Sequence, residues 1–306
     1  MAFSLRKNSS RSLVGLDIDG RYLAAVESDG KQIGRVASVE LPDGLVRDGE
    51  VVDVEGLASA LKDFAARASL PKNVRLGVAN QQIVVRAIDL PVIEDPAERD
   101  AAVRFQAAEA IAMPLDEAVL DYQIAAFEED GAGGQRMRVV LVAARRAMVE
   151  AFVGAAKKAG LKTDGIDLDA FALMRVLADD SGENARVYCH LGAVTNLAIG
   201  VGSSCLFTRP MATTWDEEHA AAQLADEIRL SIDYYMAQVN ARPVGEALVS
   251  GPGSRDAELV ESLASHLGIP TSVAAPVGSF DISHLLTDDD PYRYTIAAGL
   301  ALEASA

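Results

Sequence analysis

The sequence predicts an α/β protein made of two similar halves, with a separate unit inserted into the first half. Residues 13–27, "LVGLDIDGRYLAAVE", show a strand, a turn and a returning strand, and a third strand, a helix and a fourth strand follow. The opening pattern returns in "RVYCHLGAVTNLAIGVGSSCLFTRP" when His190 is aligned with Asp17. A two-fold internal similarity is a signal of fold. Because strands and helices do not alternate regularly, a doubly wound sheet is not indicated.

The first hairpin carries an acid where a buried strand is expected. Residues 13–18 indicate a buried strand, Asp19-Gly20 a two-residue turn that needs positive φ, and residues 22–26 the returning strand. Asp17 then lies on a central strand beside a tight turn. Because a buried carboxylate is costly without a partner, Asp17 predicts a metal, a phosphate-bound cation or a hydrogen-bond network. A solvated turn acid is the alternative.

The insert at residues 82–162 is predicted to be a compact βαββα unit. It begins with the strand "IVVRAIDLP" and a helix that starts at Pro96 and stops before Pro114. Two strands follow, joined by the exposed turn "EDGAGGQ", and a helix in "RRAMVEAFVGAAKKAG" ends the unit at the cap Gly160.

The second half contains three further predicted features. "ADEIRLSIDYYMAQ" has the apolar spacing of a helix, and "EALVSGPGSRDAELVESLASHLGIPTSVAAP" indicates a strand, a glycine turn, a helix and a strand. The late segment "YRYTIAAGLALEA" predicts a helix of small residues that suits close packing.

Composition excludes several classes of function. The chain has 28 Lys and Arg against 45 Asp and Glu, a formal charge of −17, which argues against nucleic acid and favours basic peptides or basic protein faces. No stretch approaches the roughly 20 apolar residues of a membrane span, and the basic start "MAFSLRKNSSRS" lacks a signal-peptide core, so a cytoplasmic protein is expected.

Reactive side chains form no familiar catalytic or metal motif. The four histidines lack metal-ligand spacing, and no HExxH, Walker A or GxSxG sequence occurs, so neither a metalloenzyme nor a serine hydrolase is indicated. Cys189 and Cys205 lie in apolar runs and are expected to be reduced core thiols.

The order of "VGLDIDGRYLAAVE", "LPDGLVRDGEVVD", "AVRFQAAEAIAMPLDEAVLDYQI", "VLVAARRAMVEAFVGAAKKAGLKTDGIDLDAFALMRVL" and "LADEIRLSIDYY" resembles the type IV pilus assembly protein PilM family. That family belongs to the actin-like ATPase superfamily and is related to the division protein FtsA. The resemblance implies a two-lobed actin-like (ribonuclease H-like) ATPase fold. It places subdomain 1A at 12–81 and 163–185, an inserted 1C at 82–162, subdomain 2A at 186–213 and 244–306, and a reduced 2B region at 214–243.

The resemblance also implies a site for ATP with Mg²⁺ between the lobes, its phosphates held by the backbone N–H groups of two hairpins. Asp17 would face Mg²⁺, and no residue is assigned a catalytic role. The cofactor-binding positions carried over are Asp17, Asp19 and Gly20 in the first hairpin, Gly192, Ala193 and Thr195 in the second, Gly251 and Gly253 in the adenosine turn, and Glu227 and Ser231 on the helix before it.

Four departures from the family pattern argue against ATP turnover. His190 stands where the second hairpin usually has an acid, and a neutral or cationic imidazole cannot replace a carboxylate in orienting Mg²⁺-bound water. Asp19 replaces a glycine and would oppose a phosphate. Pro252 removes an N–H from the adenosine turn, and only "ATTWDEEHAAAQ" remains of the usual 2B link.

The resemblance implies a non-catalytic assembly component at the inner face of the cell membrane. It would bind the cytoplasmic N-terminal tail of a PilN-like membrane protein, contact pilus motor and platform proteins, and be peripheral to the membrane through these partners. An open sheet edge or a groove between 1A and 1C would accept the tail by strand addition. The resemblance leaves open self-association and the choice between a pilus, a secretion system and DNA uptake.

Two alternatives belong to other classes. An active ATPase or kinase needs an acid near the γ-phosphate, where His190 stands. An FtsA-like filament former usually ends in an amphipathic membrane helix, and none is evident around "GLALEASA".

Overall fold

The computed structural model describes residues 12–29, 33–129, 134–179, 183–238, 241–274 and 290–302. These residues form two compact units, unit 1 at 82–150 and unit 2 at 12–81 and 151–302. The basic N-terminal segment, His284, the chain end and most of the turn "EDGAGGQ" lie outside the described residues. Among the helices that are described, none has the length and apolar character needed to cross a bilayer.

Unit 1 has the predicted order of elements. It contains β7 (Val84–Pro91), α2 (Pro96–Ala110), β8 (Ala118–Glu129), β9 (Gln135–Arg145) and the start of α3 (Arg146–Lys158). The sheet order is β7-β9-β8, all antiparallel. Asp95 caps α2 by accepting from the amides of Ala97 and Glu98. The unit ends at Glu150, within α3, whereas the sequence placed the end of the insert at residue 162.

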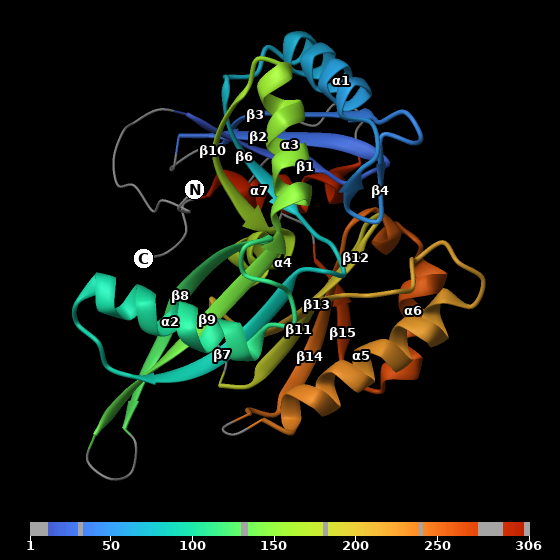
Figure 1. The fold of residues 1–306 in the computed structure, drawn as a ribbon. Helices are drawn as coiled ribbons and strands as arrows, with labels where there is room; N and C mark the ends of the chain where they lie inside the picture. The colour runs from blue at the N-terminus through green and yellow to red at the C-terminus, as the bar shows by residue number, and fades with distance from the viewer. Residues whose placement is uncertain are drawn as a thin grey trace. The chain divides into compact units, whose positions relative to one another are not determined.

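The first sheet of unit 2 has the order β10-β6-β1-β2-β3 (Figure 1). Its strands are β1 (Leu13–Ile18), β2 (Tyr22–Ser28), β3 (Ile33–Glu40), β6 (Asn73–Val78) and β10 (Lys162–Leu168). β1, β2 and β3 are antiparallel, and β1, β6 and β10 are parallel. α1 (Val54–Arg67) follows a short hairpin of β4 (Val46–Arg47) and β5 (Glu50–Val51) that the sequence did not predict.

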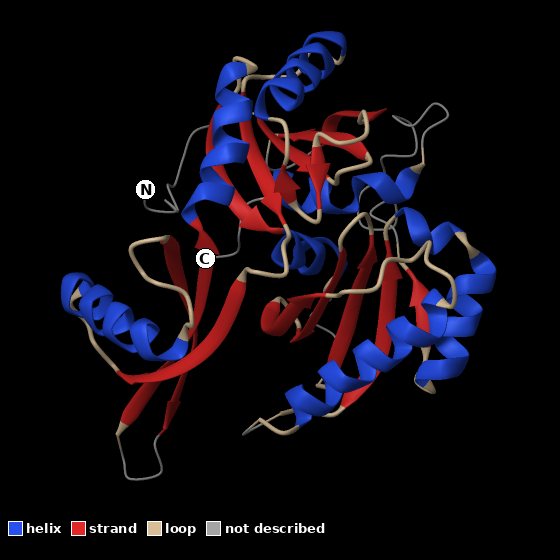
Figure 2. Ribbon diagram, turned by 45° about the vertical axis from the view of Figure 1, so that its right-hand side comes forward, coloured by secondary structure: helices blue, strands red, loops and turns tan. Residues whose placement is uncertain are grey.

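The second sheet repeats this topology, and its strands are the red arrows at the lower right of Figure 2. Its order is β13-β12-β11-β14-β15, with β11 (Ala185–Leu191), β12 (Thr195–Val201), β13 (Ser204–Pro210), β14 (Val244–Ser250) and β15 (Thr271–Val273). β11 pairs antiparallel with β12 and parallel with β14, as β1 pairs with β2 and β6. The predicted internal repeat is therefore confirmed. The core on one face comes from α5 (Ala220–Met236) and α6 (Ala257–Leu267), and it contains the free Cys189, whereas the free Cys205 is only partly buried.

Two short helices join the sheets. α4 (Asp169–Leu177) packs on β11 and β12, and α7 (Thr295–Ala301), which follows the 3₁₀ turn η4 (Pro291–Tyr294), packs on β1 and β2. The two helices contact each other closely because Gly299 has no side chain. A Cβ at this position would lie 2.0 Å from the carbonyl oxygen of Ala172. Gly15 allows α7 to approach β1 equally closely, since a Cβ there would lie 2.0 Å from the carbonyl oxygen of Ala297. The predicted small-residue helix is confirmed, whereas β10 and α4 were not predicted.

Replacing Gly299 by Ala is expected to destabilise the protein, because the new methyl group meets backbone that cannot move cheaply. Overpacking of this kind costs about 1–3 kcal/mol, so the melting temperature should fall clearly in a calorimetric scan. Gly154→Ala is the control, since the described residues leave open space around Gly154 in α3 and Ala is the better helix former. Equal melting temperatures for Gly299→Ala and the wild type would contradict the packing account.

Candidate functional site

The first hairpin places Asp17 and Asp19 at the end of β1. Asp17 pairs with Ala24 across the ladder and is 2% exposed. The Asp19 amide donates to the Tyr22 carbonyl over 3.2 Å, so the two central turn residues are Gly20 and Arg21. The predicted Asp19-Gly20 turn is therefore wrong by one residue. Gly20 has φ of 112°. A two-residue hairpin with positive φ at its first central residue favours glycine there, because glycine has no Cβ.

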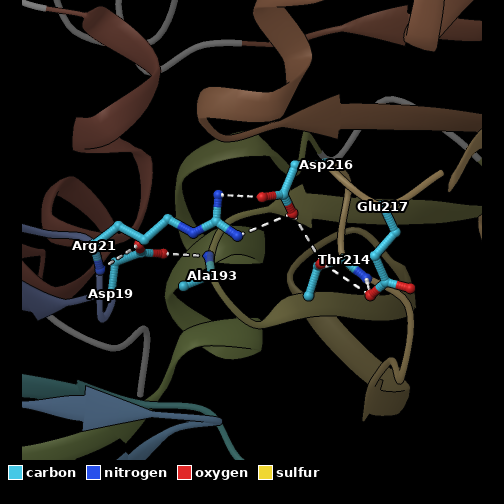
Figure 3. A network of polar contacts seen from close by, with 6 residues as sticks. All are labelled: Asp19, Arg21, Ala193, Thr214, Asp216 and Glu217. Atoms are coloured by element: carbon cyan, nitrogen blue, oxygen red, sulfur yellow. Dashed lines mark hydrogen bonds and ion pairs between the residues drawn. The ribbon is translucent and has the colours of Figure 1, made fainter. Parts of the chain in front are cut away.

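The turn of the second hairpin lies against the first. β11 and β12 pair through Leu191 and Thr195, so residues 192–194 form the turn. Oδ2 of Asp19 accepts a hydrogen bond from the Ala193 amide over 2.7 Å (Figure 3). An amide that was predicted to face a phosphate therefore faces a carboxylate of the protein itself.

A small cavity beside the hairpins is lined by buried polar side chains. Its volume of about 10 Å³ is close to the space that one water needs, and its lining includes Asp17, Asp169 and His190. One oxygen of each acid and Nδ1 of His190 have no hydrogen-bond partner among the described residues. Gly77 allows the approach of Asp169, because a Cβ there would lie 2.3 Å from Oδ1 of Asp169. No three His, Cys, Asp or Glu side chains in the described ranges are arranged as ligands of one metal ion.

The carboxyl groups around this cavity have strongly raised pKa values. Burial, followed by the charges of Asp169 and Asp19, holds the pKa of Asp17 well above its ordinary value. Burial raises the pKa of Asp169 to about 8, and the charges of Asp19 and Asp167 add to the effect. Burial also raises the pKa of Asp19 to about 6, although the hydrogen bond from the Ala193 amide acts in the opposite direction. A cation bound here would favour the ionised carboxylates.

His190 supplies no positive charge to the site. It is 2% exposed, and burial lowers the pKa of its imidazole to about 4. The ring is therefore neutral at pH 7. Thr195, predicted for the second hairpin, is fully buried at the start of β12, and its hydroxyl oxygen has no partner in the described part of the chain.

The predicted adenosine turn follows β14 and is tightly packed. Gly251 has φ of 89°, and a Cβ there would lie 2.8 Å from the Leu191 amide nitrogen. A Cβ on Gly253, in the 3₁₀ turn η1 (Pro252–Arg255), would lie 2.5 Å from Cγ of Trp215. The space left by the two missing side chains is therefore filled by β11 and by the indole of Trp215.

Glu227 and Ser231, predicted to face adenosine, hold the segment before α5 in place. The Glu227 carboxylate accepts hydrogen bonds from the Ala212 amide (3.1 Å), the Thr213 amide (3.0 Å) and the Arg209 guanidinium (2.9 Å). Burial raises the pKa of Glu227, and the Thr213 and Ala212 hydrogen bonds outweigh this, so the pKa lies below its ordinary value. The buried Ser231 hydroxyl donates to the Glu227 carbonyl over 2.7 Å. Contact of either residue with adenosine stays a prediction.

A larger cleft brings three of the predicted parts together. Its volume is about 450 Å³, within the range of small-molecule sites. Asp19 of the first hairpin, residues 192–193 of the second and Pro252 of the adenosine turn all line it. Arginines line it as well, among them Arg21 and Arg255. Asp17 instead lines the small cavity, and Asp19 is shared by both.

Sequence reasoning missed Asp169, Arg21 and Trp215. Asp169 directly follows β10, which is parallel to β6 and β1. The carboxyl ends of parallel strands meet at one edge of a sheet, where ligands bind in open α/β sheets, so recognising "KTDGIDL" as a strand would have indicated Asp169. Arg21 and Trp215 are far apart in sequence and carry no local signal.

A family profile described as type IV pilus assembly protein PilM matches residues 15–209, more than half of the chain. The chain belongs to the type IV pilus assembly protein PilM family. The resemblance drawn from the sequence motifs is therefore confirmed.

Solved structures agree with this PilM family assignment at the level of fold. A chain of a "PilM-PilN type IV pilus biogenesis complex" superimposes with a TM-score of 0.80 at 22% identity, over 96% of this chain and 98% of that chain. Ethanolamine utilization protein EutJ from Carboxydothermus hydrogenoformans gives 0.55 at 13% identity, over 97% and 91%. A Bacteroides thetaiotaomicron protein of unknown function with an actin-like ATPase fold gives 0.50 at 10% identity, over 90% and 95%. The chain has the actin-like ATPase fold.

The residues of this site suit ATP with Mg²⁺ in some positions and conflict with it in others. The cleft volume and its arginines suit a polyphosphate, and the unpartnered oxygens of Asp17 and Asp169 suit a divalent cation. Asp19 conflicts with a phosphate, because its carboxylate already accepts from the Ala193 amide. The site therefore fits the nucleotide only when Asp19 turns away from Ala193 and Trp215 leaves the glycine turn.

Replacing Asp169 by Asn is expected to flatten the dependence of stability on pH. The folded-state pKa of about 8 exceeds the ordinary value of 3.8. The folded chain thus keeps a proton that the unfolded chain loses, and stability falls as pH rises from about 4 to about 8. Without this group the slope should be less negative by up to about 1.4 kcal/mol per pH unit. Urea titrations in EDTA across this range measure it.

The control for this experiment is Asp164→Asn, which removes an exposed carboxyl of the same strand, β10. It should keep the wild-type slope. If Asp169→Asn also kept the wild-type slope, the raised pKa of Asp169 would be contradicted.

Proposed function

We propose that this protein is a component of a type IV pilus assembly platform that binds the cytoplasmic tail of a PilN-like membrane protein and holds Mg-ATP without turning it over. It would lie at the cytoplasmic face of the inner membrane through that partner. The match of the PilM profile to residues 15–209 carries the proposal. The superposition on a chain of the PilM-PilN complex over almost the whole length supports it.

The nucleotide part of the proposal uses residues of both sheets. Asp17 and Asp169 would hold Mg²⁺, the amides of the two hairpin turns would face the phosphates, and Arg255 would add a positive charge. When bound, the nucleotide would supply a charged bridge between the two hairpins. His190 stays neutral where hydrolysis would need a carboxylate to orient water, so we propose binding without turnover.

The partner part of the proposal rests on open sheet edges and on charge. A peptide that adds a strand needs an edge with unpaired backbone groups. In the described part of the chain, three of the sheets end in edge strands: β7 and β8, β3 and β10, and β13 and β15. The formal charge of −17 attracts the basic residues that lie next to a membrane span on its cytoplasmic side.

Calorimetric titration with Mg-ATP tests the nucleotide part. Asp17→Asn removes a proposed Mg²⁺ partner and should raise the dissociation constant at least about tenfold, which corresponds to ~1.4 kcal/mol. Asp19→Gly frees the Ala193 amide and should lower it by about the same factor. Phosphate release in the same samples should stay at the level of ATP alone. Release that Asp17→Asn abolishes would show an enzyme instead.

Titration with a synthetic tail peptide tests the partner part. The peptide is the N-terminal cytoplasmic segment of the PilN-like protein from the same genome, and its scrambled form is the control. Binding should weaken several-fold as salt screens the acidic surface. Hydrogen exchange should slow along one edge strand. Equal binding of the scrambled peptide, or protection confined to helices, would contradict strand addition.

A further inference from the structure

The segment between β13 and α5 lies on the predicted adenosine turn. We call residues 213–217 the strap. The strap is folded on itself, since the Thr214 amide and hydroxyl donate to the Glu217 carboxylate over 2.8 Å and 2.9 Å. The Glu227 carboxylate anchors its start through the Thr213 amide and hydroxyl. The strap is therefore a defined turn with a fixed attachment to α5.

Trp215 covers the glycine turn from this strap. A Cβ on Gly253 would lie 2.5 Å from Cγ of the indole, so the ring rests directly on the glycine backbone. The Arg21 guanidinium lies 5.3 Å from the ring centroid, within reach of a cation–π contact. Nε1 of the indole is buried and has no partner among the described residues. A flat ring on the glycine turn occupies the surface that an adenine ring would need.

Asp216 ties the strap to the other sheet. Its two carboxylate oxygens each lie 3.0 Å from a guanidinium nitrogen of Arg21, in the turn of the first hairpin (Figure 3). Hydrogen bonding to Arg21 lowers the pKa of Asp216, so the pair is ionised at pH 7. Both side chains are about two-fifths exposed, at 41% and 43%, and exposed ion pairs are weak. A ligand can therefore break this contact.

We propose that the strap occupies the nucleotide cleft in place of a ligand, with Trp215 on the adenosine turn and Asp216 clasped by Arg21, so that an adenine nucleotide binds only after the strap has left. Asp19 acts with it, because its carboxylate holds the Ala193 amide in the phosphate region of the same cleft. This inference rests on the nucleotide part of the proposed function and adds its regulation.

The single tryptophan of the chain gives a direct signal of the strap. Asp216→Asn weakens the ion pair with Arg21 and should expose Trp215 to water. The emission of Trp215 should then shift to longer wavelength, and acrylamide should quench it more strongly. Glu218→Gln is the matched control, because it removes the same charge two residues further along the chain, where the side chain is 90% exposed. Unchanged emission in Asp216→Asn would show that the ion pair between Asp216 and Arg21 does not hold the strap in place.

Titrations with Mg-ATP test the competition. A closed strap lowers the fraction of binding-competent protein, so Asp216→Asn should bind a few times more tightly than wild type and Trp215→Ala about ten times more tightly. Glu218→Gln should bind like wild type. Equal or weaker binding by Trp215→Ala, in a sample whose circular dichroism matches wild type, would contradict competition between the strap and the nucleotide. It would leave the proposal of nucleotide binding intact. If neither wild type nor any variant bound Mg-ATP, the nucleotide part of the proposed function would be contradicted. The proposed competition between strap and nucleotide would be contradicted as well.

Discussion

The close contact between α4 and α7 is the constraint on which the rest of unit 2 depends. α4 packs on β11 and β12, and α7 on β1 and β2, so this helix pair fixes the two sheets relative to each other. The contact between α4 and α7 needs Gly299 against Ala172, and the contact of α7 with β1 needs Gly15 against Ala297. At either glycine a Cβ would clash with backbone. Arginines hold the end of α7, since Arg175 donates to the Gly299 carbonyl and Arg75 to the carbonyls of Leu300 and Leu302.

This arrangement brings the two hairpin turns to one place and decides the chemistry there. Asp17 on β1 and Asp169 directly after β10 line a cavity too small for more than one water. Burial raises the pKa of both carboxyl groups, and the charge of Asp169 adds to the effect on Asp17. A cation would relieve the repulsion. Without a cation, the state of lowest free energy keeps protons on Asp17 and Asp169. In this state Asp19 accepts a hydrogen bond from the Ala193 amide.

The parts that the sequence predicted well are those with a local signal. The two hairpins, the insert and the small-residue helix follow from periodicity, turn residues and composition. The first turn was placed one residue early because Gly20 fits either central position of a hairpin. β10 was missed because it is irregular, with a register shift between Thr163 and Gly165. Trp215 and Arg21 have meaning only after folding, since their contact joins two sheets.

Three side chains work against catalysis at this site. His190 stays neutral among acids that are themselves hard to ionise, Asp19 accepts a hydrogen bond from the Ala193 amide of the second hairpin, and Trp215 covers the predicted adenosine turn. Asp19 and Trp215 thus fill, with contacts of the chain itself, places that a bound nucleotide would need. Such contacts would slow a catalyst, because its ligand must displace the protein's own groups in every cycle. A platform component would not, because its task is to keep a fixed surface for its partners.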